Sequence, residues 1–133
     1  MESRMQQLLF LAIAGALGSL SRYALGGLIQ KATGIDFPWG TLIVNATGCL
    51  IIGYFMQLAL NTDIIPANLR VVVTIGFLGA FTTFSTFSYE TVKLLEAGVF
   101  MPALLNILAN VGIGLAATFS GMLLGKITLG GIG

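Results

Sequence analysis

The sequence predicts an all-α integral membrane protein, with transmembrane helices that form a single domain over residues 1–133. Apolar residues make up 56% of the chain and charged residues only 8%, whereas soluble domains carry about 25% charged residues. The mean hydropathy is +0.98. The chain contains four apolar segments, each of about 20 residues, which is the length that crosses the hydrocarbon core of a bilayer. These segments use nearly the whole chain, so no room remains for a soluble catalytic domain.

The first helix is expected over residues 5–30, where an apolar run extends from Leu8 to Leu28. Residues 1–20 could instead be a secretory signal peptide, with Arg4 as its basic start and a cleavage site at residues 14–16. The apolar run continues well past that cleavage site, which a cleaved signal does not require. A retained transmembrane helix is therefore the favoured interpretation.

The remaining three helices are expected over residues 39–60, 69–95 and 99–126. Short connections that contain glycine, proline or aspartate separate them, and such residues interrupt regular structure. Because the connections are short, sequential helices should be antiparallel neighbours. Strands of a membrane barrel would instead show alternating patterns of about ten residues, and the segments show none.

The third segment is interrupted near its middle by residues 76–88, which contain two glycines, four phenylalanines and five hydroxyl side chains. Polar groups and broken backbone at membrane depth are tolerated only against protein or a water-filled path. Gly76 and Gly79 flank a turn that could unwind and free backbone carbonyls for a cation. The alternative is that both glycines only permit close contact between helices.

Rings and hydroxyls run side by side along this part of the third helix. At a spacing of three residues the two stripes are Phe81, Phe84 and Phe87, and Thr82, Ser85 and Ser88. A phenyl ring has a positive edge and a hydroxyl is a hydrogen-bond donor, so together they could offer an anion several weak sites without a charge that would trap it. Alternatively, the rings face lipid or core and the hydroxyls bond to carbonyls one turn earlier.

Other polar side chains lie inside or beside the apolar segments. Asn45, in the second segment, needs partners for its amide and could donate to an anion or bridge two helices. Asn106 and Asn110 are one turn apart on the fourth segment. Arg22 is either an interfacial anchor or a charge that attracts anions into a vestibule. Glu90, just past the third segment's hydroxyls, could pair with a basic residue or hold a loop.

Positive charges are nearly balanced between the two sides of the membrane. The side with both termini carries Arg4, Arg70 and Lys126, and the other carries Lys31 and Lys93, with Arg22 added if it reaches the interface. The positive-inside rule therefore predicts no strong preference for one orientation in the membrane. The chain could insert in both orientations and pair about a two-fold axis in the membrane plane, although a modest bias could still select one orientation. An oligomer is expected because four short helices enclose a pore poorly.

Several functional classes are disfavoured. The net charge of +1 and the lack of a basic run argue against nucleic acid as a partner. With no histidine and with Cys49 as the single cysteine, zinc, haem and nucleophile–base catalysis have no residues to use. Cys49 is interpreted as a packing residue. A proton-coupled multidrug transporter would need a carboxylate embedded in the membrane, and the first two segments contain none. A role as a membrane anchor subunit would not explain the polar and aromatic residues at 76–88.

Three motifs together resemble the Fluc fluoride channels, also called the CrcB family, over essentially the whole chain. The motifs are Gly18-x-x-x-Arg22-Tyr23, Gly40-Thr41-Leu42-x-Val44-Asn45-x-x-Gly48, and Gly76-Phe77-Leu78-Gly79-x-x-Thr82-Thr83-Phe84-Ser85-Thr86-Phe87. The third motif is highly specific, whereas the first alone would be weak. Gly114-Leu115 and the small residues of the fourth segment also match.

The resemblance implies a dual-topology antiparallel homodimer in the bacterial plasma (inner) membrane, surrounded by lipid. Such a dimer has two fluoride pathways, and it exports cytoplasmic fluoride passively, which would confer fluoride resistance. Hydrogen fluoride enters cells as a neutral molecule and ionises in the near-neutral cytoplasm, so the anion needs an exit. The third helix is broken in this family.

The resemblance also implies roles for individual residues. Phe84 and Phe87 match a pair that lines the pathways with ring edges, and Asn45 matches the pathway asparagine. Gly79 and Thr82 match the break whose backbone carbonyls hold a structural sodium ion at the dimer interface.

Further pathway positions are expected on all four helices. Asn110 lies where family members often have a serine, and Asn106 where many have a tyrosine, so the geometry of this polar track is specific to this chain. Thr41 and Glu90 match polar positions near a pathway end, and Arg22 matches a basic vestibule position. Ser85 and Thr86 complete the set as hydroxyls expected along the pathway.

Overall fold

The computed structural model describes residues 3–132, and over these residues all regular structure is helical. It contains four helical stretches long and apolar enough to cross a membrane, so the predicted all-α membrane architecture is confirmed. The first, second and fourth stretches are α1 (Arg4–Thr33), α2 (Trp39–Asn61) and α6 (Phe100–Ile132). The last of these continues beyond the expected end at residue 126.

Helix α1 begins and ends at residues that favour those positions. At its start the Ser3 hydroxyl accepts the Gln6 N–H at 3.2 Å, and the Gln6 side chain accepts the Ser3 N–H at 2.9 Å. This reciprocal capping box satisfies two amide groups that a helix start would otherwise leave unpaired. At its end Gly34 adopts a φ of 90°, which glycine tolerates readily. Between these ends α1 runs without interruption.

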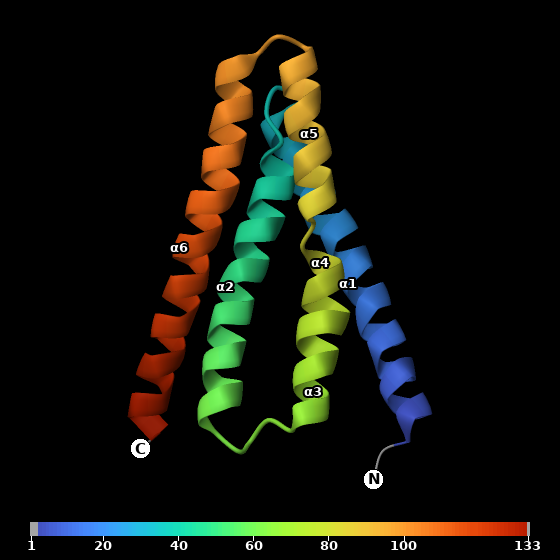
Figure 1. Cartoon of the computed structure of the whole chain (residues 1–133), viewed down its shortest axis with the longest axis vertical. Helices are drawn as coiled ribbons and strands as arrows, with labels where there is room; N and C mark the ends of the chain where they lie inside the picture. Colours follow the sequence, from blue (N-terminus) through green and yellow to red (C-terminus); the bar gives the residue numbers. More distant parts are fainter. Residues whose placement is uncertain (1–2, 133) are drawn as a thin grey trace.

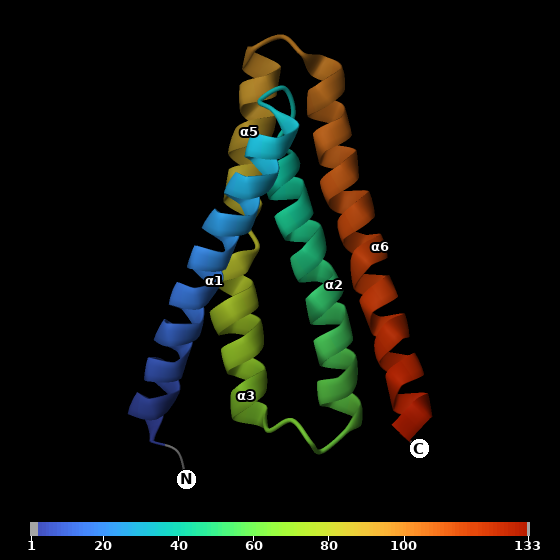
Figure 2. The same ribbon diagram turned by 180° about the vertical axis from the view of Figure 1, so that it is seen from behind.

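The helices form a splayed bundle in which each is antiparallel to the next (Figure 1). Both ends of the described chain and the connection over residues 62–66 lie at one end of the bundle, and the other two connections lie at the opposite end. Helix α2 runs along α6, while α1 packs on the middle of the third stretch. Seen from behind, the helices converge towards the end with the α5–α6 connection and diverge towards the termini (Figure 2).

Glycines allow α2 and α6 to lie backbone to backbone. A Cβ atom on Gly53 would collide with the carbonyl oxygen of Thr118, and one on Gly121 would collide with that of Leu50. In lipid, helices associate through such close packing and not through the hydrophobic effect. The α2–α6 pair therefore forms one half of the bundle, against which the third stretch is placed.

The third stretch consists of several helical pieces. They are α3 (Ala67–Val71), the π-helix η1 (Val72–Leu78), α4 (Gly79–Phe81) and α5 (Phe84–Glu96). Between α4 and α5, Thr82 has φ −81° and ψ 157° and Thr83 has φ −150° and ψ 110°, both extended. We call these two residues the 82–83 linker. The turn between Gly76 and Gly79, which could have unwound, is helical, and Gly76 instead allows close contact with Ala14 of α1.

Candidate functional site

The 82–83 linker is held by the side chain of Asn45 on α2. The backbone N–H of Thr83 donates to Asn45 Oδ1 at 2.8 Å, and Asn45 Nδ2 donates to the Thr83 carbonyl at 3.1 Å. One carboxamide thus satisfies both backbone groups of an extended residue, much as a neighbouring strand would. Since unpaired backbone groups are costly at membrane depth, Asn45 stabilises the linker conformation directly.

Two backbone carbonyls lose their helical donors at the linker. In a continuous helix Gly79 would accept from Thr83 N–H, and Thr82 would accept from Thr86 N–H. Here Thr83 N–H is bound to Asn45, and Thr86 N–H donates to Thr83 Oγ1 at 3.2 Å. The carbonyls of Gly79 and Thr82, both expected to hold a cation, are therefore released from the regular helical pattern.

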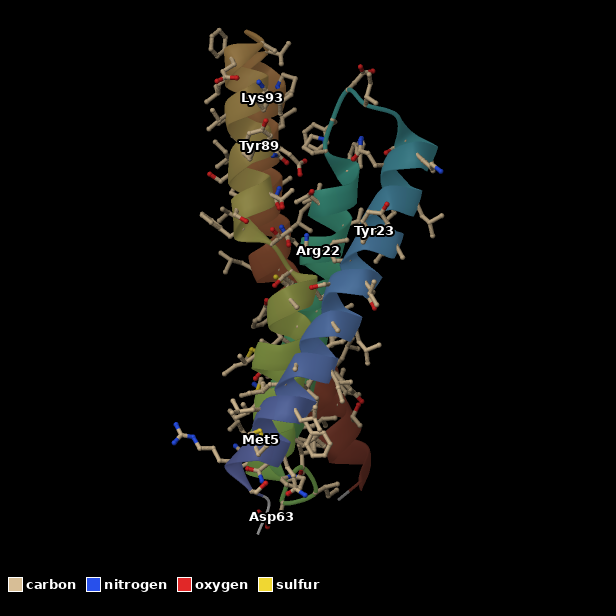
Figure 3. The ribbon with its side chains drawn as sticks, turned by 90° about the vertical axis from the view of Figure 1, so that its right-hand side faces the viewer. Met5, Arg22, Tyr23, Asp63, Tyr89 and Lys93 are labelled. Atoms are coloured by element: carbon tan, nitrogen blue, oxygen red, sulfur yellow. The ribbon has the colours of Figure 1, made fainter. Side chains whose placement is uncertain are left out.

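A third carbonyl at the same place has a charged partner. The Nε of Arg22, on α1, donates to the carbonyl oxygen of Ala80 at 3.0 Å. Figure 3 shows Arg22 on the side of α1 that faces the third stretch, with Tyr89 and Lys93 further along α5. Arg22 is half-buried. Its side chain thus binds the backbone next to the 82–83 linker and also borders the space beside the linker.

A hydrogen-bonded ladder runs from Asn45 across α6 to α5. Asn45 Nδ2 donates to Asn110 Oδ1 at 3.2 Å, and Asn110 Nδ2 donates to both the carbonyl and the Oδ1 of Asn106 at 2.9 Å. Asn106 Nδ2 then donates to Thr91 Oγ1 at 2.9 Å, and this hydroxyl donates to the Phe87 carbonyl at 2.8 Å. Every bond in this ladder is donated in the direction from Asn45 towards Phe87, so the ladder fixes the orientation of three carboxamides between the linker and Phe87.

Phe84 and Phe87 begin α5 and face the same cleft. Their ring centroids are 5.5 Å apart and the ring planes are inclined by 63°, an edge-to-face arrangement. Phe87 is 9% exposed, whereas Phe84 is 78% exposed in the single chain. The cleft has a volume of about 400 Å³. We call it the inner cleft; its lining includes Asn45, Gly79, Thr82, Thr83, Phe84, Phe87 and Asn110.

A second cleft of about 790 Å³ opens on the other side of the linker. We call it the outer cleft; its polar lining includes Ser19, Arg22, Gln30, Asp36, Thr41, Thr83, Thr86, Tyr89, Glu90 and Lys93. The Thr41 hydroxyl donates to the Glu90 carboxylate inside it. Lys93 forms an ion pair of 2.8 Å with Glu96. Thr83 lines both clefts, so the linker lies between them.

The structure gathers most of the predicted site residues around the linker, in one or other cleft. Two differ. Ser85 is exposed and lines neither cleft, and Asn106 is 1% exposed and lies behind the inner cleft as part of the ladder. Thr91 and Ala80 were missed by sequence reasoning, because their roles come from partners on other helices. Thr83 was predicted only as part of the third motif, although a threonine directly before a helix is a common N-terminal cap, and its side chain caps α5 here.

The arrangement suits the passage of an ion more than a reaction. The inner cleft is lined by two phenyl rings and by amide and hydroxyl groups, and groups of these kinds can stabilise an anion without a fixed positive charge. Among the described residues, no group of three or more histidine, cysteine, aspartate and glutamate side chains could hold a metal ion. The oxygen atoms that line the inner cleft belong to backbone carbonyls and to amide and hydroxyl side chains.

Comparison with known proteins places the chain in a family. The family model described as "CrcB-like protein, Camphor Resistance (CrcB)" matches residues 9–122. A protein of Geobacter sulfurreducens named "Fluoride-specific ion channel FluC" is 50% identical over 119 residues, covering 90% of this chain and 96% of that protein.

Relatives with the same name occur in other bacteria. One from Dehalococcoides mccartyi is 49% identical over 123 residues, covering 92% of this chain and 95% of the relative. One from Nitrosococcus oceani is 42% identical over 122 residues, covering 92% of this chain and 98% of the relative. With these matches over nearly its full length and four helices able to span a bilayer, the chain belongs to the CrcB-like family of multi-pass membrane proteins.

Proposed function

We propose that this protein is a fluoride-selective channel that lets cytoplasmic fluoride leave the cell and so relieves fluoride toxicity. The relatives that cover nearly the whole chain are named fluoride-specific ion channels. The observation that carries the proposal is the inner cleft, where the Phe84 and Phe87 rings lie beside the Asn45 carboxamide. Family membership also confirms that the protein is not an enzyme.

Fluoride would move through a series of weak contacts. Ring edges of Phe84 and Phe87 supply partial positive charge, and the carboxamides of Asn45 and Asn110 line the same cleft, where an N–H group would exchange a bond to protein for one to the ion. Each contact replaces part of the hydration shell. Because none of these four side chains carries a net charge, the ion is not held in one deep well, and conduction requires that it can leave.

The driving force is the fluoride gradient itself. Hydrogen fluoride crosses membranes as a neutral acid and ionises inside the near-neutral cytoplasm, so the anion accumulates there and flows out through an open path. The sequence contains no phosphate-binding loop of the kind that would couple transport to nucleotide hydrolysis. Passive export is therefore the simplest mechanism that fits the site.

We also propose that two copies of the chain assemble as an antiparallel, dual-topology homodimer with two fluoride pathways. Phe84 is 78% exposed in the single chain although it borders the inner cleft. A second copy placed across this face would cover the ring and complete the wall of the cleft. The near balance of positive charge between the two ends of the bundle supports insertion in both orientations.

A structural sodium ion at the dimer interface is the last part of the proposal. The carbonyls of Gly79 and Thr82 fit this role, because both lack their helical donors and both residues line the inner cleft. Unwound carbonyls of this kind coordinate sodium in membrane proteins. The ion would supply a fixed positive charge beside the linker and tie two subunits together.

The proposed function is tested by ion efflux from liposomes. Purified protein is reconstituted into vesicles loaded with either potassium fluoride or potassium chloride, and efflux is followed with an ion-selective electrode after valinomycin addition. Fluoride should leave rapidly and chloride should stay inside. Equal release of the two anions, or release of neither, would contradict a fluoride-selective channel. Protein-free vesicles measure the leak.

A further inference from the structure

We propose that Gly18 and Arg22 of α1 act as a positioning unit for the 82–83 linker, and that Arg22 serves conduction through its Nε–H more than through its charge. The inference rests on the proposed function, because it assigns these two residues to the same ion path. It gives a physical reason for the Gly18-x-x-x-Arg22 spacing, which is a weak motif by itself.

The Ala80 carbonyl needs a donor from outside its own helix. Helix α4 ends at Phe81 and the next two residues are extended, so Ala80 lies in a last turn whose carbonyls have no regular helical partner. Arg22 Nε fills that position at 3.0 Å. A bond from a charged donor to a carbonyl is stronger than a neutral one, and the donor comes from a helix 58 positions away in sequence.

Gly18 brings α1 close enough for this bond to form. It lies one turn before Arg22, so the two residues share a face of α1. A Cβ atom on Gly18 would collide with the carbonyl oxygen of Phe77 and would lie 3.1 Å from the Cβ of Ala80. Any larger side chain would therefore push α1 away from the third stretch at the level of α4, and the Arg22 side chain would be displaced with it.

The surroundings of Arg22 argue against a role based on net charge. The outer cleft is lined by two cations, Arg22 and Lys93, and by two acids, Asp36 and Glu90. These four formal charges cancel, so the cleft has no excess of positive charge to concentrate anions. What distinguishes Arg22 from Lys93 is its direct contact with the backbone beside the linker.

Three substitutions of Arg22 separate the donor from the charge. Arg22→Gln places an N–H at the same number of bonds from Cα as Nε but removes the charge. Arg22→Lys keeps the charge but puts a methylene group at that position. Arg22→Met has neither. Each variant is reconstituted in the fluoride efflux assay, which reports a rate constant per channel and, separately, the fraction of vesicles that contain an active channel.

The rate constant of Arg22→Gln should stay within about threefold of wild type. The rate constant of Arg22→Met should fall about tenfold or more, because this is the loss expected when a hydrogen bond to a charged group is removed. The fraction of active vesicles should be the same for both, since a folding defect would lower that fraction instead. A fall in Arg22→Gln as large as that in Arg22→Met would overturn the proposal, as would wild-type conduction in Arg22→Met. Retention in Arg22→Lys together with loss in Arg22→Gln would show that charge is the operative property.

Gly18→Ala tests the second half of the unit, with Gly112→Ala on α6 as its matched control. A Cβ atom on Gly112 has no heavy atom within 4 Å and this residue lines neither described cleft, so this variant should conduct like wild type. Gly18→Ala should lower the rate constant about as much as Arg22→Met, by the same loss of the cap. Equal rates in the two alanine variants would overturn the role of Gly18. Absence of fluoride efflux in the wild-type protein would instead contradict the proposed function itself.

Discussion

The side-chain carboxamide of Asn45 forms hydrogen bonds to the 82–83 linker in the way that a neighbouring β-strand would bond to an extended segment. It binds the N–H and the carbonyl of Thr83 and still donates to Asn110. Its donors are thus engaged by protein in the single chain, so a passing anion would have to compete with these bonds. Phe84 and Phe87 are different, because neither side chain can form such a hydrogen bond.

Replacing Phe84 or Phe87 with isoleucine should slow fluoride efflux roughly tenfold, because the branched side chain has no polarised ring edge. Phe119→Ile is the matched control, since Phe119 is 70% exposed on α6 and lines neither described cleft. All three variants should migrate like wild type in size-exclusion chromatography. Unchanged efflux in both pathway variants would show that ring edges do not carry the ion.

At the scale of elements, the third stretch shows the limit of local sequence rules. The turn between Gly76 and Gly79 was considered as a place that could unwind, because glycine is the most permissive residue. The extended residues are instead Thr82 and Thr83, β-branched residues that tolerate extended backbone well. Asn45 and Arg22 then provide the hydrogen bonds that this conformation needs. The break is therefore placed by partners on other helices and not by flexibility.

The hydrogen-bonded ladder between α5 and α6 leads to a prediction about the stability of this helix pair. Asn106→Leu keeps the number and branching of the side-chain heavy atoms but removes the Oδ1 acceptor of the Asn110 amide and the amide donor to the Thr91 hydroxyl. Each lost hydrogen bond costs about 0.5–1.5 kcal/mol. Thermal unfolding in detergent should shift to lower temperature, and fluoride efflux should fall as Asn45 loses its support. Asn61→Leu, which removes an amide bonded only within its own helix, should do neither.

Coupling along the ladder can be measured by adding Thr91→Val to Asn106→Leu. Because the two residues share a hydrogen bond of 2.9 Å, the destabilisation of the double variant should be smaller than the sum of the two single effects. Strict additivity would show that the bond contributes nothing to the stability of the α5–α6 pair.

The whole molecule is nearly symmetric in charge. Arg4, Arg70 and Lys126 belong to the end of the bundle with the termini, and Lys31 and Lys93 belong to the opposite end. Neither end is a strong cytoplasmic anchor, because orientation follows an excess of lysine and arginine. This balance and the exposure of Phe84 both favour the proposed antiparallel pair.

A reporter fused to the C-terminus should therefore signal from both sides of the membrane. The double variant Arg4→Gln and Arg70→Gln should shift the signal strongly towards the outside, because it leaves Lys126 alone at the terminal end against two lysines at the other. Glu96→Gln, which changes charge without removing a cation, serves as the control. A one-sided signal from the unmodified chain would refute dual insertion.

Composition and hydropathy alone determined that this chain is a four-helix membrane protein with polar chemistry concentrated near residues 76–88. These properties follow from local physics, because a helix in lipid needs only its own length and apolarity. Tertiary structure decided which residues leave the helix, which carbonyls are released, and that Asn106 is a buried bridge. Those outcomes depend on hydrogen bonds between residues 38, 58 and 65 positions apart, and no local pattern encodes which distant side chain will reach a given carbonyl.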